Sequence, residues 1–353
     1  MSRQIQHFSR SCALRLTPIL AVGVFGLAVF APLFSAPPPP VPDSRPAILL
    51  ETKMAGVSLG GLLYLLRDRT RKLDLSGVRS RDAEFQAATR SSPGFGFSKD
   101  AHWGRLRFRG GVQDRQHLML EFAMPSLDTI DVYLVSPSGA IRHIPGGDVP
   151  DFRHRAVRHR NEVVDLRFPE DGEYSVYIRL TSTGAVTYKL KGWDLASLTL
   201  YLERERLAFG VYFGIMVAML VYNMFVFLSI RDLAYLYYVI FIVTFVLMQA
   251  AIDGNAYQYL WPAGGMYSRI GVPVLLYATV ITAGQFARRF VLLPHFAPVI
   301  NKLLMTTMSV AAAGIAATVG MELMEMRTLV LPANLVALVG IGLAIAGAAT
   351  ALY

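Results

Sequence analysis

The sequence predicts a multidomain membrane protein, in which an all-β domain outside the cytoplasm precedes a bundle of transmembrane helices. Two observations lead to this fold class. The 353 residues are 54% hydrophobic and only 17% charged, with a mean hydropathy of +0.42, and a soluble chain of this size carries more charge. The charge is also unevenly placed, because only four of the 25 Asp and Glu residues lie beyond position 206. The second half is therefore suited to lipid and the first half to water.

The net charge of +9 does not indicate a nucleic-acid partner. Residues 43–206 carry 25 Lys and Arg against 21 Asp and Glu without a basic stripe, and much of the remaining excess lies at the ends of hydrophobic runs. The single cysteine, Cys12, precedes the exported domain, which can therefore form no internal disulfide and no thiolate metal site.

Residues 1–36 are predicted to form a signal peptide or a retained signal anchor. A basic start is followed by an apolar run from Leu16 to Phe34, which is long enough to cross a bilayer. Both alternatives place the following residues outside the cytoplasm. Residues 37–55 are predicted to be a Pro-rich linker, because the proline cluster from Pro37 to Pro46 cannot form a helix.

Residues 56–195 are predicted to form an extracytoplasmic β-sandwich that resembles a jelly roll. Short runs rich in β-branched and aromatic residues alternate with turn sequences such as Pro137-Ser138-Gly139 and Glu170-Asp171-Gly172. Evenly spaced short strands without intervening helical periodicity are typical of sandwiches. The strand-like runs cover residues 106–108, 118–122, 130–135, 163–168, 174–180 and 186–190.

After a juxtamembrane connector at residues 196–206, the segment 207–353 is predicted to hold five transmembrane helices. No run has a charged side chain in its interior, and a charge at mid-bilayer costs at least about 2.5 kcal/mol. If residue 206 is outside, Arg231 and the pair Arg288-Arg289 fall on the cytoplasmic side, as the positive-inside rule requires. The apolar runs cover residues 207–229, 233–252, 271–287, 303–320 and 328–351.

The sequence contains no phosphate-binding loop, dinucleotide-binding fingerprint or nucleophile elbow, so we expect no enzyme and no cofactor in this chain. Metal ligation is also not expected. The best cluster, His154 and His159 with Asp148 and Asp151, lies in an arginine-rich stretch whose positive charge repels a divalent ion. We interpret this stretch as a solvated or carbohydrate-facing loop.

Trp103 and Trp193 flank the strand-rich region, and each is either a core residue or a platform that stacks on a sugar ring. His102, Asp148 and Arg155 are the polar side chains expected to bond sugar hydroxyls. In the membrane segment, polar residues such as Asn223 are expected either to bond across helices or to act in a sensor. A transporter would show ionisable midplane residues or matched broken helices.

The membrane segment resembles the bacterial seven-transmembrane receptors with diverse intracellular signalling modules, the 7TMR-DISM family. Residues 62–193 are similar to the type 2 extracellular domain of the same receptors. This similarity is carried by Leu66-Arg67-Asp68, Leu73-Asp74-Leu75 and Gly147-Asp148. The similarity of the membrane segment is carried by Gly210-Val211-Tyr212-Phe213-Gly214, Tyr222-Asn223-Met224-Phe225, Ser229-Ile230-Arg231-Asp232 and Asp253-Gly254-Asn255-Ala256-Tyr257.

The resemblance implies a jelly-roll domain that binds a carbohydrate-like or other small ligand, and a seven-helix bundle that signals to a cytoplasmic diguanylate cyclase or histidine kinase, usually as a homodimer. It also implies packing or signalling roles for Tyr222, Asn223, Asp253 and Asn255. Since the chain stops after five of seven spans, without an output domain, we expect the sensory and membrane portion of a receptor that is either truncated or works without an enzyme of its own.

Such a receptor would lie in a bacterial inner membrane with residues 37–206 in the periplasm, and its partners would be the ligand, the lipid bilayer and a cytoplasmic effector. The alternative is a membrane subunit of a transporter or export complex, whose periplasmic domain binds a partner protein.

Overall fold

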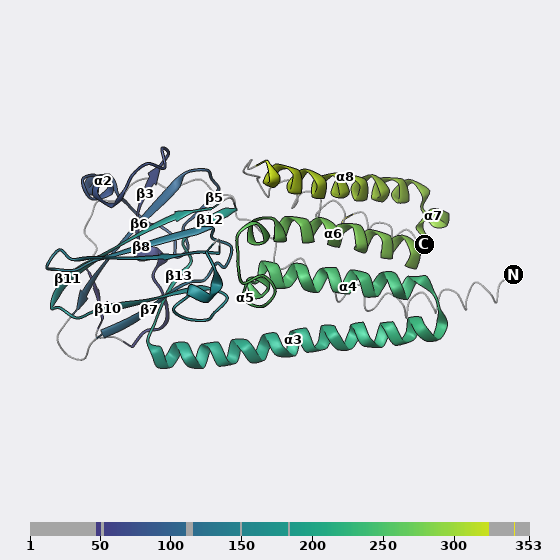
Figure 1. Cartoon of the computed structure of the whole chain (residues 1–353), viewed down its shortest axis with the longest axis horizontal. Helices are drawn as coiled ribbons and strands as arrows, with labels where there is room; N and C mark the ends of the chain where they lie inside the picture. The colour runs from purple at the N-terminus through teal and green to yellow at the C-terminus, as the bar shows by residue number, and fades with distance from the viewer. Residues whose placement is uncertain are drawn as a thin grey trace.

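The computed structural model describes residues 47–50, 53–110, 116–148, 150–182, 184–324 and 342. The β-domain forms one end of the molecule, and long helices run from it along the longest axis (Figure 1). The predicted signal segment, most of the Pro-rich linker and nearly all of the predicted span at 328–351 lie outside the described residues.

The β-domain is a sandwich of two sheets, as predicted. The larger sheet has the order β4-β3-β6-β11-β8-β9, with β1 paired to β6, and the smaller has the order β10-β7-β13-β2. All pairs are antiparallel except β1 with β6. The larger sheet comprises β1 (Ile48–Leu49), β3 (Tyr64–Asp68), β4 (Gln86–Ala87), β6 (Ala101–Gly110), β8 (Thr129–Val135), β9 (Ile141–Gly146) and β11 (Gly172–Thr181). The smaller comprises β2 (Ala55–Ser58), β7 (Gln116–Phe122), β10 (Glu162–Phe168) and β13 (Leu190–Trp193), and a separate pair joins β5 (Gly94–Phe97) to β12 (Ala185–Thr187).

The core lies between the two sheets and follows from the alternation of each strand. In the larger sheet Val176 of β11 is in register with both Leu106 and Leu134, and all three side chains point inward. In the smaller sheet Val164 pairs with Leu120. Because each fully buried aliphatic side chain contributes roughly 1.5–3 kcal/mol, a core built from both inner faces can hold a domain that lacks disulfides.

Part of the outer face of the larger sheet is covered by residues 68–85, which include α2 (Leu75–Arg79) and the short helix η2 (Asp82–Glu84). Asp68 is buried and organises the start of this segment, since its Oδ1 accepts bonds from the backbone N–H of Thr70 and of Arg71, each at 2.9 Å. Two further short helices in the described part of the domain are η1 (Gly60–Leu62) and η3 (Phe152–His154).

Four helices in the described part of the chain are long and apolar enough to cross a membrane. They contain the first four predicted runs: α3 (Leu195–Ile230), α4 (Leu233–Ile252), α6 (Met266–Phe290) and α8 (Pro298–Leu323). Two short helices, α5 (Asn255–Tyr259) and α7 (Leu293–Phe296), lie between them. The long helices pack side by side in chain order, α3 on α4, α4 on α6 and α6 on α8 (Figure 1).

Helix α3 begins well before its apolar run, so residues 196–206 continue the helix that enters the membrane. Its 36 residues span about 54 Å, which exceeds the roughly 30 Å of a hydrocarbon core. Asp194 caps the start, because its Oδ1 accepts a 2.8 Å bond from the backbone N–H of Ser197. The first turns of α3 therefore lie beside the β-domain and connect it rigidly to the bilayer.

The distribution of cations agrees with the predicted orientation. The turn from α3 to α4 and the segment from α6 to α8 lie at the end of the helices away from the β-domain (Figure 1). Arg231, Arg288 and Arg289 occupy this end. Positive charge marks the cytoplasmic side, so the β-domain is extracytoplasmic.

Candidate functional site at the domain junction

The β-domain and the helices meet in a contact that we call the junction. It consists of residues 147–148 and 150–162 of the β-domain, residues 193–209 at the end of β13 and the start of α3, and residues 253–262 after α4. The backbone N–H of Phe152 donates a 2.8 Å bond to the carbonyl oxygen of Pro262, and the hydroxyl of Tyr257 donates to that of Pro150. The two parts of the molecule are therefore joined by direct hydrogen bonds as well as by the chain.

Arg155 organises the β-domain side of the junction. Its side chain is 4% exposed, and its Nε lies 3.1 Å from Oε2 of Glu162, which is 7% exposed. The guanidinium also donates to the carbonyl oxygens of Gly147, His159 and Arg160, at 2.8, 2.8 and 3.0 Å. A planar group with five donors can hold several carbonyls at once, which a lysine cannot do.

Arg155 also reaches the helices, because its guanidinium carbon lies 4.8 Å from the ring centroid of Tyr257 in α5 and 5.3 Å from that of Phe152 in η3. These are cation–π distances, and such contacts are stronger where water is excluded. One side chain thus fixes the 147–162 loop and holds a residue of the helical part against it.

Glu205 of α3 is the centre of a second set of polar contacts. Its carboxylate oxygens lie 2.6 Å from Nε2 of His159 and 2.6 Å from Nη2 of Arg160, and it accepts a 2.8 Å bond from the hydroxyl of Tyr201. Burial opposes ionisation, but the bonds from His159 and Arg160 outweigh it, so the pKa of Glu205 lies well below its ordinary value. Glu205 is therefore an ionised carboxylate that binds the β-domain.

Arg160 joins three elements. While Nη2 binds Glu205 on α3, Nη1 donates a 3.0 Å bond to the carbonyl oxygen of Asp253 at the end of α4, and the guanidinium carbon lies 5.0 Å from the ring of Phe209. A movement of the loop that carries Arg160 therefore changes contacts to both α3 and α4.

Glu121 of β7 is fully buried beneath the start of α3 and has both carboxylate oxygens paired. Trp193 donates a 2.8 Å bond from its indole N–H to Oε2, and Asn161 donates a 2.6 Å bond from its side-chain amide to Oε1. The Trp193 ring stacks on Tyr201 of α3 at 4.6 Å between centroids. Trp193 thus anchors the helix to the domain.

Gly254 allows the two parts to approach closely. It has a φ of +79°, and a Cβ added there would lie 2.6 Å from Cβ of Pro125 and 3.1 Å from the carbonyl oxygen of Arg160. We expect Gly254→Ala to destabilise the protein by about 1–3 kcal/mol from backbone strain, and to wedge the junction apart. Thermal unfolding of the two proteins in lipid nanodiscs measures this effect.

Gly210→Ala in α3 is the matched control, because a Cβ added at Gly210 meets no atom within 4 Å. It should be neutral or slightly stabilising, since alanine favours a helix. Equal melting temperatures for the two glycine variants would show that the close approach at Gly254 does not matter.

Two of the residues predicted to bind a ligand, His102 and Trp103, are buried on opposite faces of β6. Trp103 is 0% exposed and packs beneath residues 68–85. It is therefore a core residue in this structure, which is one of the two alternatives considered for it. His102 is 1% exposed and stacks on Phe95 at 3.9 Å. Burial lowers the pKa of His102 to about 4, so the ring is neutral at pH 7. A ligand role for either residue stays a prediction.

The structure brings the other three predicted ligand residues, Asp148, Arg155 and Trp193, to the junction. Our interpretation of the arginine-rich stretch as a solvated loop is wrong for Arg155 and His159, which are buried against Glu162 and Glu205. Sequence alone could not reveal this, because a loop rich in arginine is usually on the surface and the carboxylate of Glu205 is 45 residues from Arg160.

The four residues predicted to act in packing or signalling occupy different environments. Asp253 and Asn255 lie at the junction, where Asp253 accepts a 3.0 Å bond from Gln249 and the Asn255 amide nitrogen is buried without a partner among the described residues. Asn223 donates a 2.8 Å bond to the carbonyl oxygen of Met219 within α3, and Tyr222 is 67% exposed on the same helix. Asn223 thus bonds within its own helix and, in the described part of the chain, not across helices.

Sequence reasoning missed a polar and aromatic cluster on the outer face of the larger sheet, beside the covering residues 68–85. The ring of Tyr133 stacks on His143 at 4.5 Å, and Asp131 lies 3.0 Å from Nε2 of His143 and 3.3 Å from Nη1 of Arg179. We call these four residues the outer-face cluster. All four side chains are partly exposed. The alternation of inward and outward side chains along β8, β9 and β11 could have predicted that these four lie on the same face of the sheet.

An extracytoplasmic β-sandwich bonded through buried charges to several apolar helices defines a multi-pass membrane protein with an extracytoplasmic domain. Residues 60–194 match the family described as 7TMR-DISM extracellular 2, and residues 205–353 match the one described as 7TM diverse intracellular signalling. The chain therefore belongs to the 7TMR-DISM receptors, which confirms the resemblance seen in the sequence. No curated protein matches the sequence.

Proposed function

We propose that the chain is the sensory and membrane portion of a bacterial signal-transduction receptor in the inner membrane. Its periplasmic β-domain binds a carbohydrate-like or other small ligand, and the helices relay the event, in a homodimer, to a cytoplasmic diguanylate cyclase or histidine kinase. Detection and relay are the roles of this chain, and catalysis belongs to the effector. The observation that carries the proposal is the junction, in which Arg160 binds Glu205 of α3 and the end of α4 together.

The relay follows from the energies involved. Allosteric coupling between two sites is typically about 1–3 kcal/mol, and one hydrogen bond to a buried charge contributes about 1.5–3 kcal/mol. Gaining or losing one contact of Arg160 is therefore sufficient to bias two arrangements of α3 against α4. A ligand that binds the β-domain more tightly in one of these arrangements shifts their populations.

The outer-face cluster is where we infer that the ligand binds. A sugar offers an apolar ring face and several hydroxyls, so its recognition needs an aromatic surface beside charged donors and acceptors. The His143 ring, which is stacked on Tyr133, supplies the aromatic surface, while Asp131 and Arg179 supply an acceptor and a donor. The side chain of His143 is 44% exposed, which leaves one edge of the cluster open to solvent.

Calorimetry of the whole chain in lipid nanodiscs tests this proposal, with glycans and muropeptide fragments as probes. We expect saturable binding of at least one class, and a loss of about tenfold in affinity for Asp131→Asn, which corresponds to about 1.4 kcal/mol. Asp171→Asn, in an exposed turn of the same domain, is the matched control and should bind normally. The absence of binding at millimolar concentrations would count decisively against a ligand of this class.

A further inference from the structure

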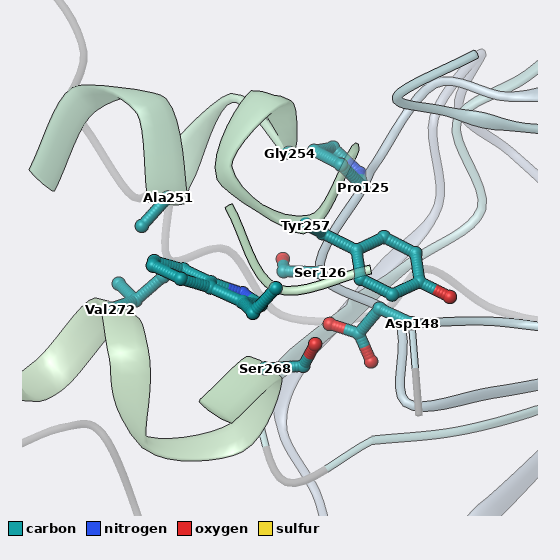
Figure 2. A pocket seen from close by; sticks show the side chains of 9 residues that line it. Pro125, Ser126, Asp148, Ala251, Gly254, Tyr257, Ser268 and Val272 are labelled. Carbon is teal, nitrogen blue, oxygen red and sulfur yellow. The ribbon is translucent and has the colours of Figure 1, made fainter. Parts of the chain in front are cut away.

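A small pocket lies inside the junction, bounded by both parts of the molecule. It encloses about 310 Å³ of empty space, part of it open to solvent. Ser126 and Asp148 line it from the β-domain, and Tyr257, Trp261 and Ser268 line it from the helical part. In Figure 2 the carboxylate of Asp148 and the hydroxyl of Ser268 point toward the same space, beside the ring of Tyr257.

Two polar atoms at this pocket have no partner in the described structure. Oδ1 of Asp148 and Oγ of Ser268 are each inaccessible to solvent and unbonded, and Asp148 as a whole is only 8% exposed. A buried polar atom without a hydrogen bond costs about 1–3 kcal/mol, and more if it is charged. Since one atom belongs to each part of the molecule, a ligand that satisfies both would bridge the junction.

The cations nearest to Asp148 are already engaged. Arg155 is paired with Glu162 in the same domain, and Arg269 of α6 donates a 2.8 Å bond from Nε to Glu322 of α8. Asp128, which precedes β8, adds a further negative charge. Burial and the charge of Asp128 raise the pKa of Asp148 to about 7, because the two cations only partly offset them. The pocket therefore lacks a counter-ion of its own.

We propose that this pocket binds a small protonated amine, with Asp148 as its counter-ion, the hydroxyls of Ser126 and Ser268 accepting further N–H bonds, and the rings of Tyr257 and Trp261 packing around the cation. Carboxylate, hydroxyl and aromatic ring are the groups that recognise an ammonium ion. The space is small, because the 310 Å³ includes open solvent, so the ligand has few heavy atoms.

An ammonium group fits better than a metal ion. Among the described residues, no group of three or more His, Cys, Asp or Glu side chains could hold a metal. A monocation with N–H donors needs only one carboxylate and a few neutral acceptors, which is what the pocket offers.

The site is separate from the outer-face cluster and does not depend on a sugar binding there. Its lining comes from the loops after β7 and β9 of the β-domain and from the end of α4 through the first turns of α6. Occupancy would therefore strengthen the contact between the β-domain and the helices. The amine would then act as a second input to the same junction.

The site is tested by titrating the whole chain in nanodiscs with methylammonium chloride at constant ionic strength. Binding is followed by calorimetry and by the fluorescence of Trp261. We expect saturable binding, reduced at least tenfold by Asp148→Asn and several-fold by Ser268→Ala, and unchanged by Asp131→Asn. Trp261→Phe should remove the fluorescence change. Affinity should rise about tenfold from pH 6 to pH 8, because a carboxyl that titrates near 7 goes from mostly protonated to mostly ionised over that range.

Thermal unfolding of each variant establishes that it is folded. If Asp148→Asn does not fold, Ser268→Ala still tests the site. The proposal is overturned if methylammonium does not bind saturably, which would mean that water alone fills the pocket. It is also overturned if sodium and potassium chloride give the same response, or if Asp148→Asn and Ser268→Ala both bind as tightly as the unmodified chain.

Discussion

Arg155→Met is expected to lower the free energy of unfolding by about 3–5 kcal/mol. Methionine retains much of the volume of the side chain but removes the charge, which leaves the carboxylate of Glu162 buried and unpaired at 7% exposure. The carbonyl oxygens of Gly147, His159 and Arg160 lose their donor as well. Chemical denaturation of the whole chain in detergent, followed by tryptophan fluorescence, measures the loss.

Two further variants separate the buried charge from other causes. The double variant with Arg155→Met and Glu162→Leu should recover part of the lost stability, because removing both members of a buried pair costs less than leaving one charge unpaired. Arg153→Met, whose side chain is 74% exposed, should change stability little. An Arg155→Met protein as stable as the unmodified chain, or a double variant less stable than the single one, would contradict this account of the pair.

Glu205→Gln is expected to cost about 2–4 kcal/mol, because it leaves the largely buried guanidinium of Arg160 without its carboxylate and weakens the contacts of His159 and Tyr201. The pKa of Glu205 is lower in the folded protein than in the unfolded chain. Its contribution is therefore complete above the ordinary glutamate pKa and decreases as the pH falls below it. The difference between the two proteins should shrink in acid, as a pH series of unfolding curves would show.

The sequence predicts most of the architecture, because the features that determine it are local. Alternation in 106–108, 130–135 and 174–180 identified β6, β8 and β11, and four apolar runs identified the long helices. The start of α3 at Leu195 was not predicted, since hydropathy marks where lipid begins and not where a helix begins. Residues 196–206 are charged because they lie outside the bilayer, in contact with water and the β-domain. They nevertheless belong to the same helix.

The sequence predicts the site less well, because its contacts join distant residues. Asp148 and Arg155 were expected to bind a ligand, and Asp253 and Asn255 to take part in signalling. The structure brings all four to the same junction, where Arg160 bonds to the carbonyl oxygen of Asp253 across 93 positions of the chain. Neither spacing nor composition indicates that pairing. Trp103 was expected either to bind a ligand or to lie in the core, and the structure places it in the core. The sequence around a tryptophan next to a strand is the same in both cases, so it could not decide between them.

The central claim is that the junction couples the β-domain to α3 and α4, and hydrogen–deuterium exchange of Glu205→Gln in nanodiscs tests it most directly. The matched control is Glu203→Gln, which removes an exposed charge two residues away on the same helix. The account predicts faster exchange in Glu205→Gln, but not in the control, at residues 147–162 and also at residues 253–262. Faster exchange confined to α3 itself, or the same pattern in both variants, would contradict the claim.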